Sequence, residues 1–335
     1  MNNPVYPWQR AQWDNWLRML AAGRVPNALL LSGQDGCGME EFGSALCHSL
    51  LCQSEKDRPC GGCKGCRLLA SENHPDYLSI VAEKKEIKVA QIRELADFFS
   101  LNRHYGQYRV AFIPRADSMN YAAANSLLKT LEEPPDGGVI VLICRRLAKL
   151  PATIRSRCRK IRFPLPGDEA VEWLAGRLSL ETEQARRRLA LFGLRPLEAS
   201  KKAEKGIDRE KFHDELAQWL SARAPLSDLS GIVERWNEQP SPLIQQWLLE
   251  ELQQIVHAAF VHGAFDAAPA APAANPPAHP PVNPPMSPPM SPPFESLQRL
   301  HGRQVQRCRL ADSNSLNPRL LLESGLLEWH KAFSR

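Results

Sequence analysis

Four cysteines that lie close together in the sequence have a spacing typical of metal ligands. They follow the pattern C-x7-C-x2-C-x2-C and are Cys52, Cys60, Cys63 and Cys66. Four thiolates satisfy a tetrahedral Zn²⁺ ion and leave no open position for a substrate, so we expect a structural zinc module at residues 52–66. A redox C-x-x-C pair is the alternative, and His48 and His74 are alternative ligands if Cys52 is not one.

A glycine-rich turn has the frame of a phosphate-binding loop without its chemistry. It follows a predicted strand and precedes a helical pattern, which is where a P-loop lies. Its glycines are Gly33, Gly36 and Gly38, and the first and last have the P-loop spacing. A working P-loop continues with a lysine, which binds the β- and γ-phosphates, and a serine or threonine, which binds Mg²⁺. Here the two positions are Met39 and Glu40, and a carboxylate there repels a nucleotide.

A second strand also departs from the pattern of a working ATPase. A predicted strand at residues 110–113 should end in an acidic pair, with one carboxylate holding Mg²⁺ and the other orienting the attacking water. Pro114 and Arg115 stand there instead. We interpret Asp117, further along, as a helix-cap or turn residue. Because both halves of the site lack their groups, we expect no ATP hydrolysis by this chain.

The elements that must position these residues alternate between strands and helices in the first half of the chain. Helical spacing of apolar residues occurs in residues 89–99 and 124–131. Short apolar runs predict strands buried on both faces at 28–31, 77–81, 110–113 and 139–144. This alternation predicts a parallel α/β sheet. From residue 168 onward the strand signals end, and amphipathic helices are predicted at 170–178, 183–192, 211–222 and 243–261.

The same pattern divides the 335 residues into three expected domains. They are an α/β domain at 1–166, a small helical domain at 167–206 and a larger helical domain at 207–335. Residues 266–293 hold 12 of the 28 prolines and cannot form a ladder or a helix. We expect a solvated insert there, either an inert loop or a docking segment for a proline-binding groove.

Composition excludes several classes of protein. With 43% hydrophobic and 24% charged residues, the chain is not generally disordered. A net charge of +5 permits contact with nucleic acid but does not argue for it. No run of about 18 apolar residues occurs, so no transmembrane helix is predicted. The first residues lack the apolar core of a signal peptide, and we therefore expect a cytoplasmic protein without a membrane partner.

Two longer motifs resemble those of one protein family. Residues 125–135 read NSLLKTLEEPP and resemble the N-A-L-L-K-T-L-E-E-P-P signature of bacterial clamp-loader ATPase subunits, which are AAA+ proteins. Residues 149–158 read KLPATIRSRC and resemble the L-P-x-T-I-x-S-R-C segment of that family. The family also carries a four-cysteine module after the P-loop helix. The resemblance covers about residues 1–200 and implies an AAA+ module, whose small helical domain is a lid, followed by a helical collar.

The resemblance also implies a function and partners. The family forms a ring of five chains that uses ATP to load a sliding clamp onto primed DNA. A member without ATP chemistry is implied to be a non-hydrolysing stator of the DNA polymerase III clamp loader. Its implied partners are the gamma/tau motor subunits and the delta subunit, with the sliding clamp and primer-template DNA met through the complex. The alternatives are an active clamp-loader motor ATPase and a stand-alone zinc-dependent DNA-binding protein.

A basic segment holds the residue that the resemblance places at a neighbour's nucleotide. Residues 145–162 contain eight Lys and Arg and no acid, which by itself indicates a solvated basic face or a contact with DNA phosphates. In the family, the arginine of the Ser-Arg-Cys motif reaches the γ-phosphate of ATP on the adjacent subunit. Arg157 occupies that position, as an arginine finger, and we expect Ser156 and Cys158 to position its loop.

The sensor positions also depart from those of motor subunits. Cys144 and Arg145 stand where motor subunits carry threonines that contact the γ-phosphate. Arg195, followed by Pro196, lies near the second sensor position, and we interpret it as a structural or surface residue. Both departures agree with an empty nucleotide site. The cysteines that we expect to be ordinary buried thiols are Cys37, Cys47, Cys144 and Cys308.

Overall fold

The chain folds into two compact units in the computed structural model. The structure describes residues 5–55, 58–84, 86–201, 208–222, 225–261, 292–312 and 316–334. One unit comprises Met1–Ser179 and Leu194–Glu198, and the other comprises Leu180–Gly193 and Ala199–Arg335. Apart from residues 292 and 293, the predicted insert at 266–293 lies outside the described residues. The two boundaries between the three domains expected from the sequence stay predictions.

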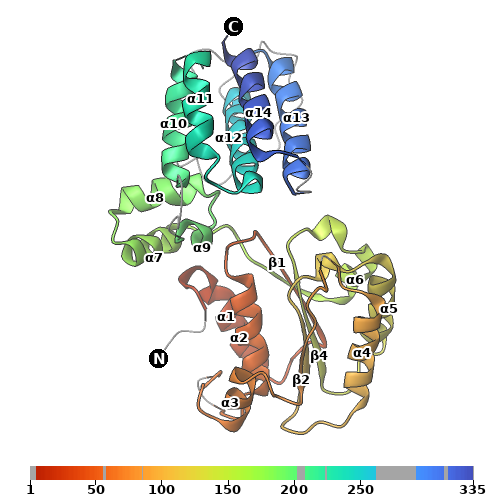
Figure 1. Cartoon of the computed structure of the whole chain (residues 1–335). Coiled ribbons are helices and arrows are strands. Elements are labelled where there is room, and N and C mark those ends of the chain that lie inside the picture. Colours follow the sequence, from red (N-terminus) through yellow and green to blue (C-terminus); the bar gives the residue numbers. More distant parts are fainter. Residues whose placement is uncertain are drawn as a thin grey trace. The chain divides into compact units, whose positions relative to one another are not determined.

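The first unit is built on a five-stranded parallel sheet (Figure 1). Its order is β2-β3-β4-β1-β5. The strands are β1 (Ala28–Ser32), β2 (Tyr77–Ser79), β3 (Arg109–Ile113), β4 (Gly138–Cys144) and β5 (Arg159–Arg162). The four strands predicted from apolar runs are confirmed, although β2 ends two residues earlier than expected. The sequence does not predict β5, because three of its four residues are basic and only Ile161 is partly buried.

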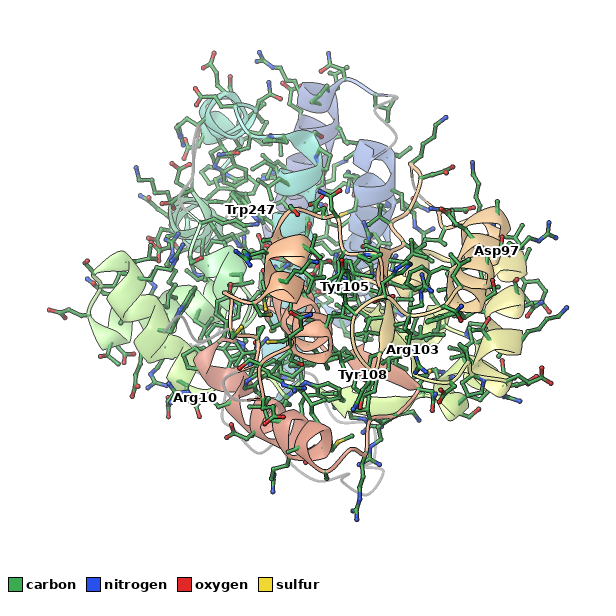
Figure 2. All side chains as sticks on the ribbon, turned by 90° about the horizontal axis from the view of Figure 1, so that it is seen from below. Arg10, Asp97, Arg103, Tyr105, Tyr108 and Trp247 are labelled. Carbon is green, nitrogen blue, oxygen red and sulfur yellow. The ribbon has the colours of Figure 1, made fainter. Side chains whose placement is uncertain are left out.

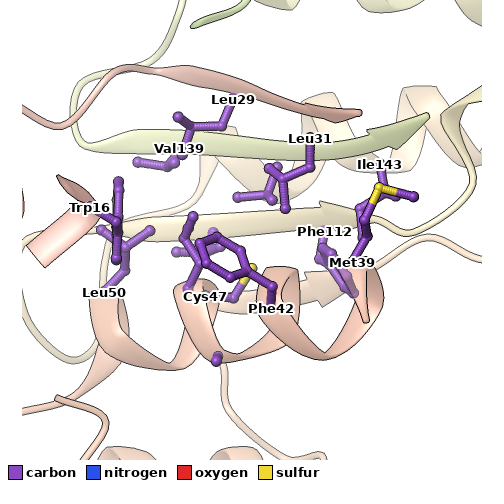
Figure 3. Close-up of a cluster of buried hydrophobic side chains, with 14 of the residues drawn as sticks. Trp16, Leu29, Leu31, Met39, Phe42, Cys47, Leu50, Phe112, Val139 and Ile143 are labelled. Carbon is purple, nitrogen blue, oxygen red and sulfur yellow. The ribbon is translucent and has the colours of Figure 1, made fainter. Parts of the chain in front are cut away.

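Helices cover both faces of the sheet (Figure 1). Successive strand side chains point to opposite faces, so Leu29 and Leu31 join one core and Leu30 joins the other. The first core contains Trp16 and Phe42 (Figure 3). It lies under α1 (Arg10–Ala21) and α2 (Met39–Leu51), and the second lies under α4 (Val89–Ser100), α5 (Tyr121–Glu132) and α6 (Ala152–Arg157). Full burial of each large apolar side chain contributes about 1.5–3 kcal/mol, which fixes the sheet between the two helical layers.

Local sequence signals set the ends of the helices that matter for the site. The Asn120 side chain accepts a 2.9 Å hydrogen bond from the Ala123 amide and so begins α5, which ends just before Pro134. Gly38, in the left-handed region, precedes α2. The remaining elements of this unit are η1 (Pro7–Gln9), α3 (Lys64–Ala70), η2 (Ala116–Ser118), η3 (Leu147–Lys149) and α7 (Asp168–Leu178).

The second unit is helical, and its described residues contain no strand. Its helices are α8 (Thr182–Leu191), α10 (Arg209–Ser221), η4 (Leu226–Asp228), α11 (Leu229–Trp236), α12 (Ser241–Val261), α13 (Phe294–Asp312) and α14 (Pro318–Phe333). The short helix α9 (Pro196–Ala199) belongs mostly to the first unit. Phe212, Trp236 and Trp329 are fully buried in one core of this unit. The predicted helices are confirmed, as is the fold class: a parallel α/β sheet domain followed by helical segments.

Candidate functional site

The four cysteines of the predicted zinc module converge on one point. Their sulfur atoms all lie within 4.8 Å of one another. The Cys52 and Cys63 sulfurs are 3.9 Å apart, and those of Cys60 and Cys66 are 4.0 Å apart. A tetrahedron with Zn–S bonds of about 2.3 Å has S···S edges of about 3.8 Å. The donor set and its spacing therefore fit a structural Zn²⁺ ion.

Backbone amides around the cluster prepare two of the sulfurs for the thiolate state. The Cys63 sulfur accepts hydrogen bonds from the amides of Cys66 (3.4 Å) and Gln53 (3.5 Å). Burial raises the pKa of Cys63, but these amide bonds and hydrogen bonds from the Cys66 and Cys60 side chains together outweigh it and lower that pKa to about 6. The Cys63 amide likewise lowers the pKa of Cys60, whereas burial raises the pKa of Cys52 and of Cys66. A bound cation is the group that would hold all four as thiolates.

Packing against the rest of the first unit holds the cysteine module in place. Cys52 directly follows α2. Cys63 is the N-cap of α3, where its sulfur accepts a hydrogen bond from the Cys66 amide. A Cβ on Gly65 would lie 2.4 Å from the Leu51 carbonyl oxygen, so only glycine permits this close approach of α3 to the end of α2. The Lys64 ammonium lies 4.7 Å from the ring centroid of Tyr105, a residue of the segment between α4 and β3 that Figure 2 labels with Arg103 and Tyr108.

The alternative ligands lie outside the cluster. His74 is buried, its Nδ1 accepts a 3.1 Å hydrogen bond from the Asp76 amide, and its ring packs on Tyr105 with centroids 5.8 Å apart. His48 packs on Tyr77 at 6.5 Å, and burial lowers its pKa. Among the described residues, the only group of three or more candidate metal ligands is the four-cysteine set. The histidines are therefore packing residues in this arrangement.

Side chains from the N-terminal segment pack onto the glycine-rich turn. The Gln9 amide nitrogen donates to the carbonyl oxygens of Cys37 (2.9 Å) and Gly38 (2.8 Å), and the Trp8 indole donates to Cys37 (2.9 Å). A Cβ on Gly38 would lie 2.4 Å from the Tyr6 ring. Met39, which occupies the position of the P-loop lysine, is 4% exposed and belongs to the core under α2 (Figure 3). The turn thus offers a phosphate no ammonium group from that position.

The charged side chains around this turn pair with one another. The Arg145 guanidinium pairs with the Glu40 carboxylate and, at 3.2 Å, with that of Asp35. Glu40 stands at the position of the Mg²⁺-binding hydroxyl, and Arg145 at the first sensor position. Two protein carboxylates therefore hold the cation that faces this turn. Each pair is partly exposed, so the network contributes little to stability.

The strand that would carry the acidic pair ends without one. Pro114 and Arg115 follow β3, and neither offers an oxygen ligand from its side chain. Asp117 lies in η2 and its carboxylate pairs with the Arg146 guanidinium at 3.3 Å. Its buried Oδ1 has no hydrogen-bond partner and its Oδ2 accepts from Arg146, so Asp117 is a turn residue whose charge is neutralised by an arginine and not a helix cap. A Mg²⁺ ion would have to compete with Arg146 for that carboxylate.

The close contact between Tyr6 and Gly38 predicts a measurable loss of stability on substitution. Gly38 and Gly23 both have positive φ, at 80° and 65°, but nothing lies within 4 Å of a Cβ on Gly23. We expect Gly38→Ala to destabilise the chain by about 2–4 kcal/mol, from backbone strain plus overlap with Tyr6, and Gly23→Ala by about 1 kcal/mol, from strain alone. Urea unfolding measures both, and equal losses would show that Tyr6 does not pack on the turn.

The Ser-Arg-Cys motif lies at the junction of α6 and β5. Arg157 ends α6, where its guanidinium donates to the Thr153 carbonyl oxygen (3.0 Å) and pairs with the Glu132 carboxylate at 2.6 Å. The Ser156 hydroxyl donates to the same carbonyl (3.0 Å). Cys158 is buried, and burial raises its pKa to about 11. Cys158 therefore anchors the junction as a packed thiol, while the Arg157 side chain stays 37% exposed.

Arg157 and the glycine-rich turn lie at opposite ends of β1. Arg159 pairs with Leu29 near the start of β1, whereas the turn follows Ser32 at its end. A five-residue strand is about 13 Å long between its end residues, more than an arginine side chain spans. Arg157 lines a surface pocket of about 360 Å³ together with Ala28 and Pro134. The Arg157 guanidinium thus lies away from the chain's own glycine-rich turn.

Sequence reasoning missed the residues that pack the turn from outside the motif. Tyr6, Trp8 and Gln9 carry no motif of their own, and only the fold brings them to Gly38. The ion pair of Arg145 with Glu40 could have been predicted, since a basic and an acidic residue each replace the usual residue of a nucleotide site. Cys37, Cys47 and Cys144 are buried as expected, while Cys308 is only partly buried.

The parallel sheet, the glycine-rich turn after its β1 strand and the helices on both faces define a P-loop-type α/β module with an added cysteine cluster. A family model described as "DNA polymerase III, delta subunit" matches residues 8–166. The DNA polymerase III subunit delta' of Pseudomonas aeruginosa is 35% identical over 269 residues, which cover 77% of this chain and 79% of that protein. The chain belongs to the family of DNA polymerase III delta-prime subunits.

Further similarities extend over much of the chain. The Escherichia coli K12 subunit delta' is 32% identical over 250 residues, covering 72% of this chain and 73% of that protein. A gamma subunit-related protein of Thermotoga maritima, solved as a crystal structure, superposes with a TM-score of 0.47 at 19% identity, over 97% of this chain and all of that one. Within the described ranges, none of the helices combines the length and apolarity needed to cross a bilayer.

Proposed function

We propose that this chain is a non-hydrolysing stator subunit of the DNA polymerase III clamp loader. In this role it helps to load the sliding clamp onto primed DNA during chromosomal replication, in the cytoplasm. Its partners are the gamma/tau motor subunits and the delta subunit, and it meets the clamp and the primer-template DNA through the complex. Membership of the delta-prime family and the two clamp-loader motifs support this role.

One observation carries the non-hydrolysing part of the proposal: the chain's own side chains take up the positions where ATP chemistry would occur. Met39 is buried where a lysine should reach phosphates, and the Glu40 carboxylate holds Arg145. Pro114 and Arg115 replace the carboxylates that would bind Mg²⁺ and orient water. Lysine, hydroxyl and acidic pair are all missing, so restoring one of them should not restore turnover.

Arg157 is the group through which the chain would still contribute to hydrolysis. Its guanidinium is 37% exposed, and its present partners are the half-exposed carboxylate of Glu132 and the Thr153 carbonyl oxygen. An exposed pair of this kind contributes about 0–1 kcal/mol, so Arg157 can leave Glu132 for a γ-phosphate on a neighbouring subunit at little cost. A planar, permanently charged guanidinium suits the charge that develops on the transferring phosphoryl group.

The zinc module has a structural role in this proposal. Four thiolates complete the coordination of Zn²⁺, so no position is left for a reacting molecule. The module extends from the end of α2, the helix that begins at the glycine-rich turn, and is anchored by Gly65 and Lys64. The Zn²⁺ ion would hold a segment whose Cys60 is exposed and which has few apolar side chains to bury.

The alternatives fit the site less well. An active motor ATPase would need the groups replaced by Met39, Glu40, Pro114 and Arg115. A stand-alone zinc-dependent DNA-binding protein would need a basic surface around the cysteines. The strongest run of basic residues lies instead in residues 145–162, at and around α6 and β5.

Reconstitution tests the proposed role. Purified gamma/tau and delta subunits of the same organism are mixed with this chain, and the mixture is passed over a gel-filtration column and assayed for clamp loading on primed DNA. We expect one complex that contains this chain, and loading that depends on its presence. A chain that elutes alone, from a mixture that loads clamps equally well without it, would refute the role.

A further inference from the structure

The strand β5 forms an open edge of the sheet with an unusual charge. It is the outermost strand and pairs only with β1. Its sequence is Arg159-Lys160-Ile161-Arg162, and all but Ile161 are exposed. Within the described part of the chain, these three basic side chains make no ion pair. An edge strand leaves alternate backbone amides and carbonyls without a strand partner, so this one presents both hydrogen-bonding groups and unpaired positive charge.

A groove runs along this edge. It has a volume of about 330 Å³ and lies between β5 and α1, which contributes Gln12, Trp16 and Met19. No aspartate or glutamate lines it. The Gln12 amide reaches the Arg162 carbonyl oxygen over 3.5 Å, and its own Oε1 has no hydrogen-bond partner. Helix α1 therefore flanks the edge and bonds its Arg162 carbonyl at the limit of hydrogen-bond length, but does not pair with it as a strand would.

We propose that the β5 edge and this groove bind an extended acidic segment of another protein by adding a strand to the sheet. Successive side chains of a strand alternate between faces, so Lys160 and Arg162 share one face and Ile161 lies on the other. Ile161 packs against the core that contains Trp16. A matching segment has aspartate or glutamate at alternate positions, facing Lys160 and Arg162, with an apolar residue between them that enters the groove beside Met19.

Charge selects this occupant over a second copy of the chain. Pairing β5 with itself would place three basic residues of each strand against three of the other, and like charges directly opposite are unfavourable. Basic residues on an edge strand prevent self-association in this way. The same basic residues do not repel an acidic strand, which would form both backbone hydrogen bonds and ion pairs with β5. The inference does not depend on the clamp-loader role, because neither the turn nor Arg157 takes part.

Fluorescence anisotropy with a labelled ten-residue peptide of alternating glutamate and valine tests this surface on the full chain. We expect saturable binding that weakens at least tenfold in an R159E/K160E/R162E variant. The matched control reverses three other exposed charges of the same unit, as R67E/R93E/K129E, and should bind as the unchanged chain does. Circular dichroism confirms that both variants are folded. Equal loss in the two variants would overturn the proposal.

Two peptide probes separate strand addition from simple charge attraction. N-methylation of alternate residues keeps every charge but removes the amides that one edge of the peptide donates. Methylating one alternate set should weaken binding at least tenfold, and methylating the other should leave it within twofold. Binding that ignores both methylations, or a charge-matched single-stranded DNA that binds as tightly as the peptide, would show a nonspecific basic surface and contradict strand addition.

Discussion

A clamp loader assembled with an Arg157→Ala chain should hydrolyse ATP about 10³-fold more slowly at the site beside this subunit. The arginine would stabilise charge that develops in the transition state, so the rate should suffer more than the affinity for ATP. The other sites of the ring keep their own groups, and the total rate should therefore fall only by the share of one site. Steady-state and single-turnover ATPase measurements with DNA and clamp detect this pattern.

Three variants make the Arg157 prediction specific. Arg157→Lys should rescue only partly, because an ammonium lacks the planar fork of a guanidinium. Glu132→Gln removes the partner that holds Arg157 in the isolated chain and should leave hydrolysis unchanged. Arg93→Ala changes an exposed arginine of α4 and should also have no effect. Normal hydrolysis with the alanine variant, in a complex shown by gel filtration to contain it, would remove Arg157 from the mechanism.

The second large effect concerns the cysteine module. The purified chain should contain about one zinc per molecule, and Cys63→Ala should lose it, because three thiolates leave the coordination tetrahedron incomplete. Cys63 is the most informative position, since its sulfur accepts two amide hydrogen bonds and it precedes α3. Without the metal the segment between α2 and α3 should become sensitive to protease, while the sheet stays folded on its two cores.

Metal analysis and limited proteolysis check this result together. Cys308→Ser is the matched control, since that thiol lies on α13 in the other unit and donates to the Gln245 carbonyl oxygen, as a hydroxyl also can. It should keep the full zinc content. A reduced, chelator-free preparation of the unchanged chain without zinc would contradict the module's assignment, even though the four sulfurs converge.

The parts of the fold that could be predicted are those in which residues close together in the sequence are all buried or all meet at one point. Strands β1, β3 and β4 are buried on both faces and read as continuous apolar runs, and the cysteines of the module are close enough in sequence to meet. Strand β5 was not predicted, because its residues lie at an exposed edge of the sheet and do not form an apolar run. The convergence of four thiols is confirmed, whereas the Zn²⁺ ion itself stays a prediction.

The sequence shows which groups the candidate nucleotide site lacks, but it does not predict which side chains pack there instead. The missing lysine, hydroxyl and acidic pair are visible at fixed spacings in the sequence. The contacts of Gln9 with Gly38 and of Arg145 with Glu40 join residues 29 and 105 positions apart, and local patterns carry no information at that range. The proposed role of Arg157 rests on a motif, whereas its position at the far end of β1 from its own turn is seen only in the fold.

We expect this chain to lack a working nucleotide site of its own, and equilibrium binding of Mg-ATP to the purified chain tests this expectation most directly. Isothermal titration at concentrations up to about 1 mM covers the range in which a functional P-loop protein saturates. We expect no saturable heat, because Met39 is buried, Glu40 holds Arg145 and Tyr6 packs on Gly38. Saturable binding of Mg-ATP with a micromolar dissociation constant would contradict it.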